Sequence, residues 1–237
     1  MSDYNYDKFE TAAYQLNAFQ APELGTKAPD FMLETLRGDK QNLLDFEGDF
    51  LVLELGSVTC PLFQSRRDTM QDLAQTNPDT SFAVLYVREA HPGANCGTHK
   101  TIDDKRGNAA ALDLDGETRL ILIDDLAGTA HAAYGSFPNS CFIINKNGCV
   151  LYYSDWNNPY TTGHALLALK AGKPAPRQGM FLPASPPVAF KTFKIAGKGS
   201  APDFFRGLPK LIWANLIRRN LRVLFNRPPR IMPDATC

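Results

Sequence analysis

The stretch that decides the fold is Leu51-Val52-Leu53-Glu54-Leu55-Gly56-Ser57-Val58-Thr59-Cys60-Pro61-Leu62-Phe63. Its first five residues are typical of a buried β-strand, and the glycine that follows ends the strand. Small polar residues then lead to a cysteine, and the next residue is a proline. Proline suits the first position of a helix, because a backbone N–H there would lack a partner anyway. The stretch therefore predicts a strand, a turn, and a cysteine where a helix begins.

The segments on either side of this stretch alternate between strand and helix patterns. Further strands are expected at residues 31–36, 82–87, 119–123, 141–145 and 149–153. Helices are expected at residues 60–75, 98–112, 129–134 and 161–170. Lys146-Asn147-Gly148 separates the last two strands and is typical of a hairpin turn. This order predicts an α/β fold with a mixed central sheet flanked by helices.

Four regions are expected along the chain. Residues 4–20 place Phe9, Ala13, Leu16 and Gln20 at helical spacing, so residues 1–24 are predicted to form an N-terminal helix. The α/β domain is expected to span residues 25–173. Residues 174–200 are rich in proline and are interpreted as a linker. Residues 201–237 are predicted to form a basic, amphipathic, helical C-terminal extension.

Composition excludes several classes of protein. The 237 residues are 44% hydrophobic and 21% charged, which is ordinary for a globular chain. No apolar run reaches the roughly 18–20 residues that a membrane span needs. The first twenty residues carry Asp3, Asp7 and Glu10, so they do not resemble a signal peptide, and a cytoplasmic location is expected.

The formal net charge of zero conceals an uneven distribution. Residues 1–176 hold 14 Lys and Arg against 23 Asp and Glu, whereas residues 177–237 hold 11 against 2. The two segments therefore carry net charges of −9 and +9, which indicates a basic tail with a role of its own.

A helix expected over residues 208–226 carries this positive charge. At 100° per residue, Asn215, Arg218, Arg219, Arg222 and Asn226 lie on one arc, and apolar residues fill most of the rest. Such a helix suits a membrane interface, as a peripheral contact. It equally suits packing on the chain's own acidic domain or on a second copy in a homodimer. Nucleic acid is not an expected partner, because no recognition motif is present.

The cysteines favour one reactive thiol. Five cysteines without a C-x-x-C pair indicate neither a disulfide framework nor a zinc site, and no metal is expected. Cys60 is the candidate nucleophile, because the start of a helix stabilises a thiolate and lowers the thiol pKa. The alternative is that Cys60 is a small buried apolar residue. Cys141 and Cys149 are expected to be packed, Cys96 is a lesser candidate for a resolving thiol, and Cys237 has no assigned role.

Three motifs resemble the iodothyronine deiodinases, with Cys60 at the position of the selenocysteine. They are residues 56–63, residues 82–91, and Asp155-Trp156-Asn157-Asn158-Pro159-Tyr160. The resemblance covers roughly residues 25–172, and its flanking part from Ala28 onward is shared with peroxiredoxin-like proteins. It implies the thioredoxin fold.

The resemblance also implies roles for individual residues. Cys60 takes the place of the catalytic chalcogen, and His91 is expected to bind the substrate or protonate it. Residues expected to support the site or bind substrate are Ser57, Thr59, Pro61, Tyr86, Glu89, Pro138 and Trp156. Pro138 falls where thioredoxin folds carry a cis-proline. The chain has Val58 where the family often has a cysteine, and around residues 105–107 it lacks the second histidine expected there.

The function that follows is a thiol-dependent oxidoreductase that acts on a small molecule. The Cys60 thiolate would perform a reductive dehalogenation or a related reduction, and an external thiol reductant would regenerate it, with no bound cofactor. One alternative is a general disulfide or peroxide reductase, although Thr59 directly before Cys60 is not the Thr-x-x-Cys spacing of peroxiredoxins. Another is a non-catalytic thioredoxin-fold module that binds a partner or a membrane.

Overall fold

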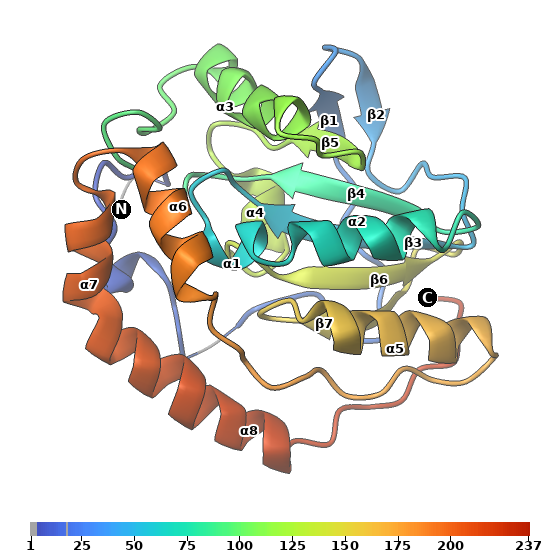
Figure 1. Cartoon of the computed structure of the whole chain (residues 1–237). Coiled ribbons are helices and arrows are strands. Elements are labelled where there is room, and N and C mark those ends of the chain that lie inside the picture. The colour runs from blue at the N-terminus through green and yellow to red at the C-terminus, as the bar shows by residue number, and fades with distance from the viewer. Residues whose placement is uncertain (1–3, 18) are drawn as a thin grey trace.

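A seven-stranded mixed β-sheet forms the centre of the molecule (Figure 1). The computed structural model describes residues 4–17 and 19–237. The strand order is β2-β1-β5-β4-β3-β6-β7. The strands are β1 (Met32–Thr35), β2 (Lys40–Asn42), β3 (Phe50–Gly56), β4 (Ser81–Tyr86), β5 (Leu120–Ile123), β6 (Cys141–Asn145) and β7 (Val150–Ser154).

Strand β3 is an interior strand of the sheet, between β4 and β6, and all seven of its residues are buried. It runs parallel to β4, with Leu53 opposite Ala83, and antiparallel to β6, with Leu53 opposite Phe142. Such a strand is covered on both faces, which explains why it reads as an almost continuous apolar run. The strand predicted before the cysteine is therefore confirmed.

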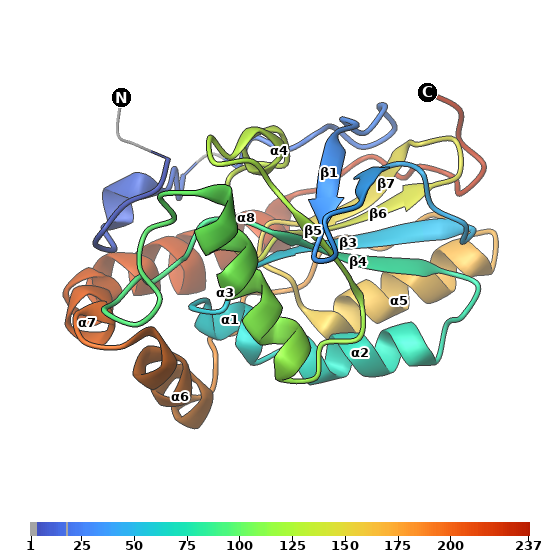
Figure 2. The same cartoon turned by 90° about the horizontal axis from the view of Figure 1, so that it is seen from above.

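Helices cover both faces of the sheet. Figure 2 shows α1, α2, α3 and α5 along one face and α4 across the other. The helices of this domain are α1 (Pro61–Gln64), α2 (Arg67–Gln75), α3 (Ile102–Leu114), α4 (Thr129–Ala133) and α5 (Pro159–Lys170). The helix predicted over residues 60–75 is thus divided in two, because the chain turns at Ser65 and Arg66.

The alternating side chains of β3 join two separate cores. Leu53 and Leu55 pack with Tyr134, next to α4, on one face of the sheet. Val52 packs on the other face with Met70 of α2 and with residues of α5. A parallel β3-α-β4 unit followed by an antiparallel β6-β7 hairpin and a helix is the arrangement of the thioredoxin fold. The predicted fold class is confirmed.

The N-terminal helix predicted for residues 1–24 is wrong. Within residues 4–17, only a single 3-10 turn, η1 (Thr11–Ala13), is helical. Residues 1–3 and 18 of that prediction lie outside the described part of the chain.

Arg88 gives the physical reason for this difference. Its guanidinium donates to the backbone carbonyl of Tyr4 at 2.6 Å and to that of Ala13 at 3.0 Å. It also lies 4.8–5.0 Å from the centres of the rings of Tyr4, Tyr6 and Tyr14. A cation that binds these carbonyls and three aromatic rings stabilises an irregular wrapped segment in place of a helix.

The linker predicted for residues 174–200 is also partly wrong. It contains helix α6 (Pro186–Ala196), which buries Thr192, Phe193 and Ala196. The following helix begins earlier than predicted. Helix α7 (Ser200–Leu211) continues through the π-helical stretch η2 (Ile212–Arg219) into α8 (Asn220–Phe225). Figure 1 shows this rod along the outside of the molecule. We call residues 174–237 the extension.

A disulfide joins the end of the extension to the sheet domain. Cys149, beside β7, is bonded to Cys237. The side chains of Asn145 and Asn147 also donate hydrogen bonds to the carbonyl of Ala235, each at 2.9 Å. The expectation that the chain has no disulfide is therefore wrong. The two cysteines are 88 residues apart in the sequence, so only the folded structure brings them together.

Candidate active site

The loop that carries Cys60 is shaped by its two neighbours, the end of β3 and the start of α1. Cys60 is the N-cap residue of α1, and Pro61 occupies the first helical turn, as predicted. The ring of Phe63 lies against Gly56, where a Cβ atom would overlap it. Glycine is therefore required at the end of the strand to let the helix return closely beneath the loop.

A buried carboxylate holds this loop from below. Glu89 accepts hydrogen bonds from the backbone N–H of Thr59 at 3.1 Å, from its hydroxyl at 2.6 Å, and from the hydroxyl of Tyr86. Burial alone would raise the pKa of Glu89, but hydrogen bonds from His99, Thr59 and Tyr86 outweigh it and lower this pKa below the usual value. Glu89 is thus an ionised anchor for the residue before Cys60.

His99 is a member of this network that the sequence analysis assigned no role. Its Nε2 lies 3.2 Å from Oε1 of Glu89, and both side chains are almost completely buried. Asn108 of α3 contacts the same Nε2 at 3.2 Å. The sequence shows only that His99 follows the polar loop of residues 91–98. No motif in the sequence indicates that it pairs with Glu89.

The loop before Cys60 is also tied to the segment that contains His91. The hydroxyl of Ser57 accepts from the backbone N–H of Ala90 at 3.3 Å. The hydroxyl of Thr59 accepts from the backbone N–H of His91 at 3.1 Å. Two loops that are separate in the sequence are therefore held side by side at the ends of the parallel strands β3 and β4.

His91 lies in an apolar and aromatic environment. Its ring is 4.3 Å from that of Phe9, 5.8 Å from Phe193 and 5.2 Å from Phe204, measured between ring centres. Burial lowers the pKa of His91 to about 3, so its imidazole is neutral at ordinary pH. Within the described residues its Nδ1 is buried without a hydrogen-bond partner.

Cys60 and His91 line the same cavity, which has a volume of about 140 Å³. Five of the predicted site residues meet there, namely Cys60, Pro61, His91, Pro138 and Trp156. The N-terminal segment supplies Phe9, Tyr14 and Leu16, and the extension supplies Phe181, Phe204, Leu208, Leu211, Ile212 and other residues. The walls are mainly apolar, so the cavity suits an apolar or aromatic group next to the sulfur.

Ser57, Thr59, Tyr86 and Glu89 do not line this cavity. They are buried behind it and act on Cys60 and His91 only through the loops that they hold. Pro138 lies at the cavity as expected, but none of the described residues has a cis peptide bond, so the expected cis-proline is wrong.

The acidity of Cys60 differs from the expectation. Its side chain is 2% exposed, and burial raises the thiol pKa to about 11, from an ordinary value of 9.0. Backbone N–H groups of Leu62 and Phe63 and the charge of Arg66 act in the opposite direction but do not offset burial. The predicted helix-terminus effect is thus present but smaller than the cost of removing the thiolate from water.

Glu54 is the acid in the middle of the apolar strand, and it is fully buried. Its carboxylate contacts Arg119 at 2.6 Å and accepts hydrogen bonds from Asn139 at 2.9 Å and Asn157 at 2.6 Å. Arg119 also pairs with Glu117 at 2.8 Å. These partners compensate the buried charge, so Glu54 fixes the chain after Pro138 and has no free proton-transfer role.

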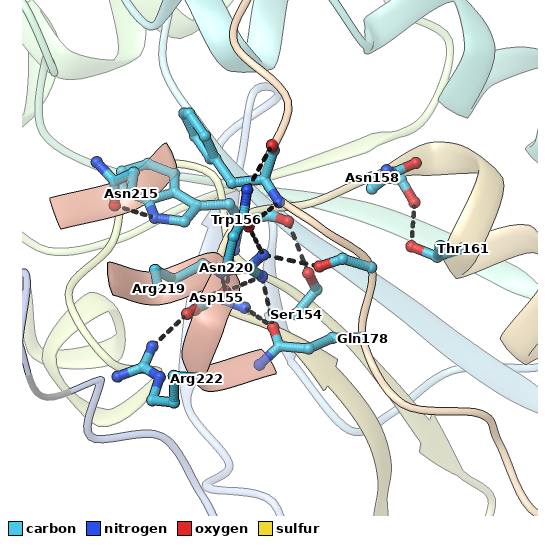
Figure 3. A network of polar contacts seen from close by, with 12 residues as sticks. Ser154, Asp155, Trp156, Asn158, Thr161, Gln178, Asn215, Arg219, Asn220 and Arg222 are labelled. Atoms are coloured by element: carbon cyan, nitrogen blue, oxygen red, sulfur yellow. Dashed lines mark hydrogen bonds and ion pairs between the residues drawn. The ribbon is translucent and has the colours of Figure 1, made fainter. Parts of the chain in front are cut away.

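A second polar network joins the extension to the same region (Figure 3). The two carboxylate oxygens of Asp155 bind Arg219 at 2.5 Å and Arg222 at 2.9 Å. The adjacent Trp156 donates its indole N–H to Asn215 at 3.0 Å. The loop with the predicted Trp156 therefore holds the extension in place over the cavity.

The described residues contain no group of three or more His, Cys, Asp or Glu side chains arranged to hold a metal ion. Nor does any helix among the described residues combine the length and apolar character needed to cross a bilayer.

The fold and this site together define a thioredoxin-fold protein with a cysteine at the N-terminus of the helix that follows the buried strand β3. A sequence profile described as iodothyronine deiodinase matches residues 1–162. Because this match covers more than half of the chain, the protein belongs to the iodothyronine deiodinase family, as the resemblance predicted.

Two curated relatives show how far the similarity extends. The chain is 32% identical to thyroxine 5-deiodinase of Aquarana catesbeiana over 152 residues, which cover 58% of this chain and 56% of that protein. It is 27% identical to thyroxine 5-deiodinase of Homo sapiens over 151 residues, which cover 58% of this chain and 49% of that protein. The chain spans about half the length of the curated relatives it matches.

A solved structure supports the fold alone. The crystal structure of a hypothetical protein from Sinorhizobium meliloti 1021 aligns with a TM-score of 0.55 and 18% identity. The alignment covers 67% of this chain and 90% of that one.

Proposed function

We propose that the protein is a deiodinase-like thiol oxidoreductase that removes a halogen from a small aromatic molecule. In this proposal Cys60 is the nucleophile, the substrate ring occupies the cavity beside it, and an external thiol is the reductant. No bound cofactor is required. The observation that carries the proposal is the shared apolar cavity, which places a cysteine and a histidine together where an aromatic ring fits.

The reaction balances in three steps. The Cys60 thiolate attacks the halogen, the carbon–halogen bond breaks, and the ring carbon takes a proton, which leaves a sulfur–halogen bond on the enzyme. A first external thiolate displaces the halide and forms a mixed disulfide with Cys60. A second external thiol releases Cys60 and leaves as the oxidised disulfide. The substrate is reduced by two electrons, which the two external thiols supply.

His91 is proposed to bind the substrate as a neutral imidazole. Because the pKa of His91 is low, its side chain is not an imidazolium at neutral pH and has no additional proton to donate to the substrate. Its buried Nδ1 has no partner in the described residues, so a polar substituent on the substrate ring would satisfy it. This assigns His91 to orientation of the ring, with the proton drawn from solvent or from the substrate's own hydroxyl.

The cavity volume limits the substrate. An apolar cavity of about 150 Å³ in another protein holds one benzene molecule. The cavity beside Cys60, at about 140 Å³, therefore has room for no more than one ring. An iodothyronine has two rings and an amino-acid side chain, so the extension would have to move before it could enter. We propose that the substrate is a single-ring halogenated aromatic, which binds while the extension lies over the cavity. We call this arrangement the closed structure.

The closed structure also favours one alternative, a non-catalytic module. A thiol that is 2% exposed and has a raised pKa is also what an inert core cysteine would show. The same burial argues against a general reductase of protein disulfides, because a protein substrate cannot approach the sulfur while the extension covers it.

Iodide release separates these functions. The protein would be incubated with a monoiodinated phenol and dithiothreitol, and in parallel with an iodothyronine. We expect iodide from the phenol, its complete loss in Cys60→Ser, and its retention in Cys96→Ser, whose thiol lies outside the cavity. Iodide release that survives Cys60→Ser would exclude the mechanism, and no release from either substrate would favour the module.

A further inference from the structure

The second half of the helical rod, residues 213–225, is inverted relative to an ordinary surface helix. Its buried residues include the polar Asn215, Arg219 and Asn220, besides Ala214 and Val223. The apolar residues of the rod that are exposed and do not line the Cys60 cavity are Phe205, Trp213, Ile217, Leu221, Leu224 and Phe225, each between 41% and 77% exposed. With Phe190 and Ile195 of α6, which are also exposed, we call these residues the outer face.

The inversion has a local cause. Asp155 binds Arg219 and Arg222, while Trp156 binds Asn215, so the polar arc of the helix is occupied by the chain's own domain. The apolar arc must then point outward. A contiguous apolar surface on a folded chain marks an interaction site, in contrast to scattered exposed apolar residues, which are common.

The charge around the outer face indicates the kind of partner. The exposed cations of the same segment are Arg177, Lys191, Lys194, Lys198, Arg206, Lys210, Arg222, Arg227 and Arg230. Among them only Arg206 and Arg222 form ion pairs with described residues, namely with Asp203 and Asp155. Residues 177–237 contain no acidic residues besides Asp203 and Asp234. The outer face is thus an apolar strip in a positively charged surround.

We infer that the outer face docks on the surface of an anionic lipid bilayer. The helix would lie in the plane of the interface, with Trp213 and the leucines at the level of the headgroups and acyl chains. Lysine and arginine side chains on its flanks would contact anionic headgroups.

A second copy of the chain explains this surface less well. In a symmetric dimer the same patch meets itself, so two segments of net charge +9 would face each other across the contact. Anionic lipid supplies the opposite charge at every point of the face. The lipid surface is therefore the partner that the charge distribution favours.

Flotation of the full-length protein with vesicles tests this inference. The vesicles would be phosphatidylcholine alone, or phosphatidylcholine mixed with phosphatidylglycerol. The test variant is Trp213→Gln with Leu221→Gln, because neither residue lines the Cys60 cavity. The matched control is Leu114→Gln with Leu167→Gln, two residues of α3 and α5 that are at least as exposed as Trp213 and Leu221 but lie off the outer face.

We expect strong binding to the anionic vesicles, weaker binding to phosphatidylcholine, and a loss of at least about tenfold in affinity in the test variant. The control variant should bind like the unaltered protein. Replacing Lys194, Lys198 and Lys210 with Gln should weaken binding to anionic vesicles alone, whereas the same change at Lys40, Lys100 and Lys173 should not.

Three outcomes would overturn the inference. They are no binding to either vesicle, equal loss in the test and control variants, and a stable dimer in sedimentation without lipid that the test variant alone dissociates. Circular dichroism of each variant would show that a loss of binding is not a loss of folding.

Discussion

The sheet domain and the extension bury opposite kinds of side chain. Strand β3 buries leucines on one side and Phe50 and Val52 on the other, and its one acid, Glu54, needs Arg119 and two asparagines to be accommodated. The second half of the extension rod buries Asn215, Arg219 and Asn220 and leaves Trp213, Ile217, Leu221, Leu224 and Phe225 exposed. The core of the sheet domain is stabilised by removal of apolar surface from water. The contact of the extension with that domain is stabilised by a few paired charges. The two regions therefore respond to different substitutions.

The largest expected effect comes from Asp155→Asn. This change leaves the buried Arg219 without its anionic partner, which costs roughly 3–5 kcal/mol in the contact of the extension. Release of the rod would expose Cys60 and return its pKa from about 11 toward 9.0. At pH 7 the alkylation rate of Cys60 should then rise by about a hundredfold. Iodoacetamide labelling followed by mass spectrometry measures it.

The matched control for this substitution is Asp79→Asn. It removes an ion pair with Lys170 that is largely exposed, so neither the folding nor the labelling of Cys60 should change appreciably. If Asp155→Asn also leaves the labelling unchanged, the polar contact does not hold the extension over Cys60. The idea that paired charges hold the extension would then be wrong.

A second test concerns the end of the extension. Cys237→Ser removes the disulfide with Cys149 and should lower the free energy of unfolding by about 2–4 kcal/mol. Chemical denaturation with and without dithiothreitol measures this, and the reductant should bring the unaltered protein to the level of the variant. Labelling of Cys60 should stay the same, because Asp155 still holds the rod.

The same disulfide bears on the expected location. Disulfides persist in oxidising compartments and are rare in the cytoplasm, so this bond favours an oxidising compartment over the cytoplasmic location that the sequence predicted. A protein isolated from its cells with Cys237 reduced would remove this argument.

A third test, confined to acid pH, lies at the boundary between the two regions, where His91 is covered by Phe193 and Phe204. The pKa of His91 falls from 6.5 to about 3 on folding, so the unfolded chain binds a proton first. The stabilisation from a neutral His91 is complete above pH 6.5 and is lost as the pH falls toward 3. The slope is about 1.4 kcal/mol per pH unit in this window.

His91→Gln should remove this part of the pH dependence, and His164→Gln, at an exposed position, should not. Urea denaturation at a series of pH values between 3 and 7 provides the measurement. Equal slopes in the two variants would mean that His91 is in contact with water and that the extension does not seal the cavity.

Much of the sheet domain was predictable from residues alone. The run before Gly56, the Asn-Gly turn at Asn147, and the alternation of apolar segments predict the strands and the hairpin because these signals are local. The placement of Cys60 at a helix start is equally local. The helix predicted near the N-terminus failed because Arg88, distant in sequence, binds the carbonyls that a helix would use.

The site divides in the same way. The sequence by itself determined a cysteine after a buried strand, the Glu-Ala-His segment that follows the next strand, and a helix with one polar and one apolar side. Only the tertiary structure decided that Glu89 pairs with His99, that burial raises the pKa of Cys60, and that Asp155 turns the polar side of the extension inward. Periodicity fixes which residues share a face of a helix. The choice of which face is buried depends on charges supplied by distant parts of the chain.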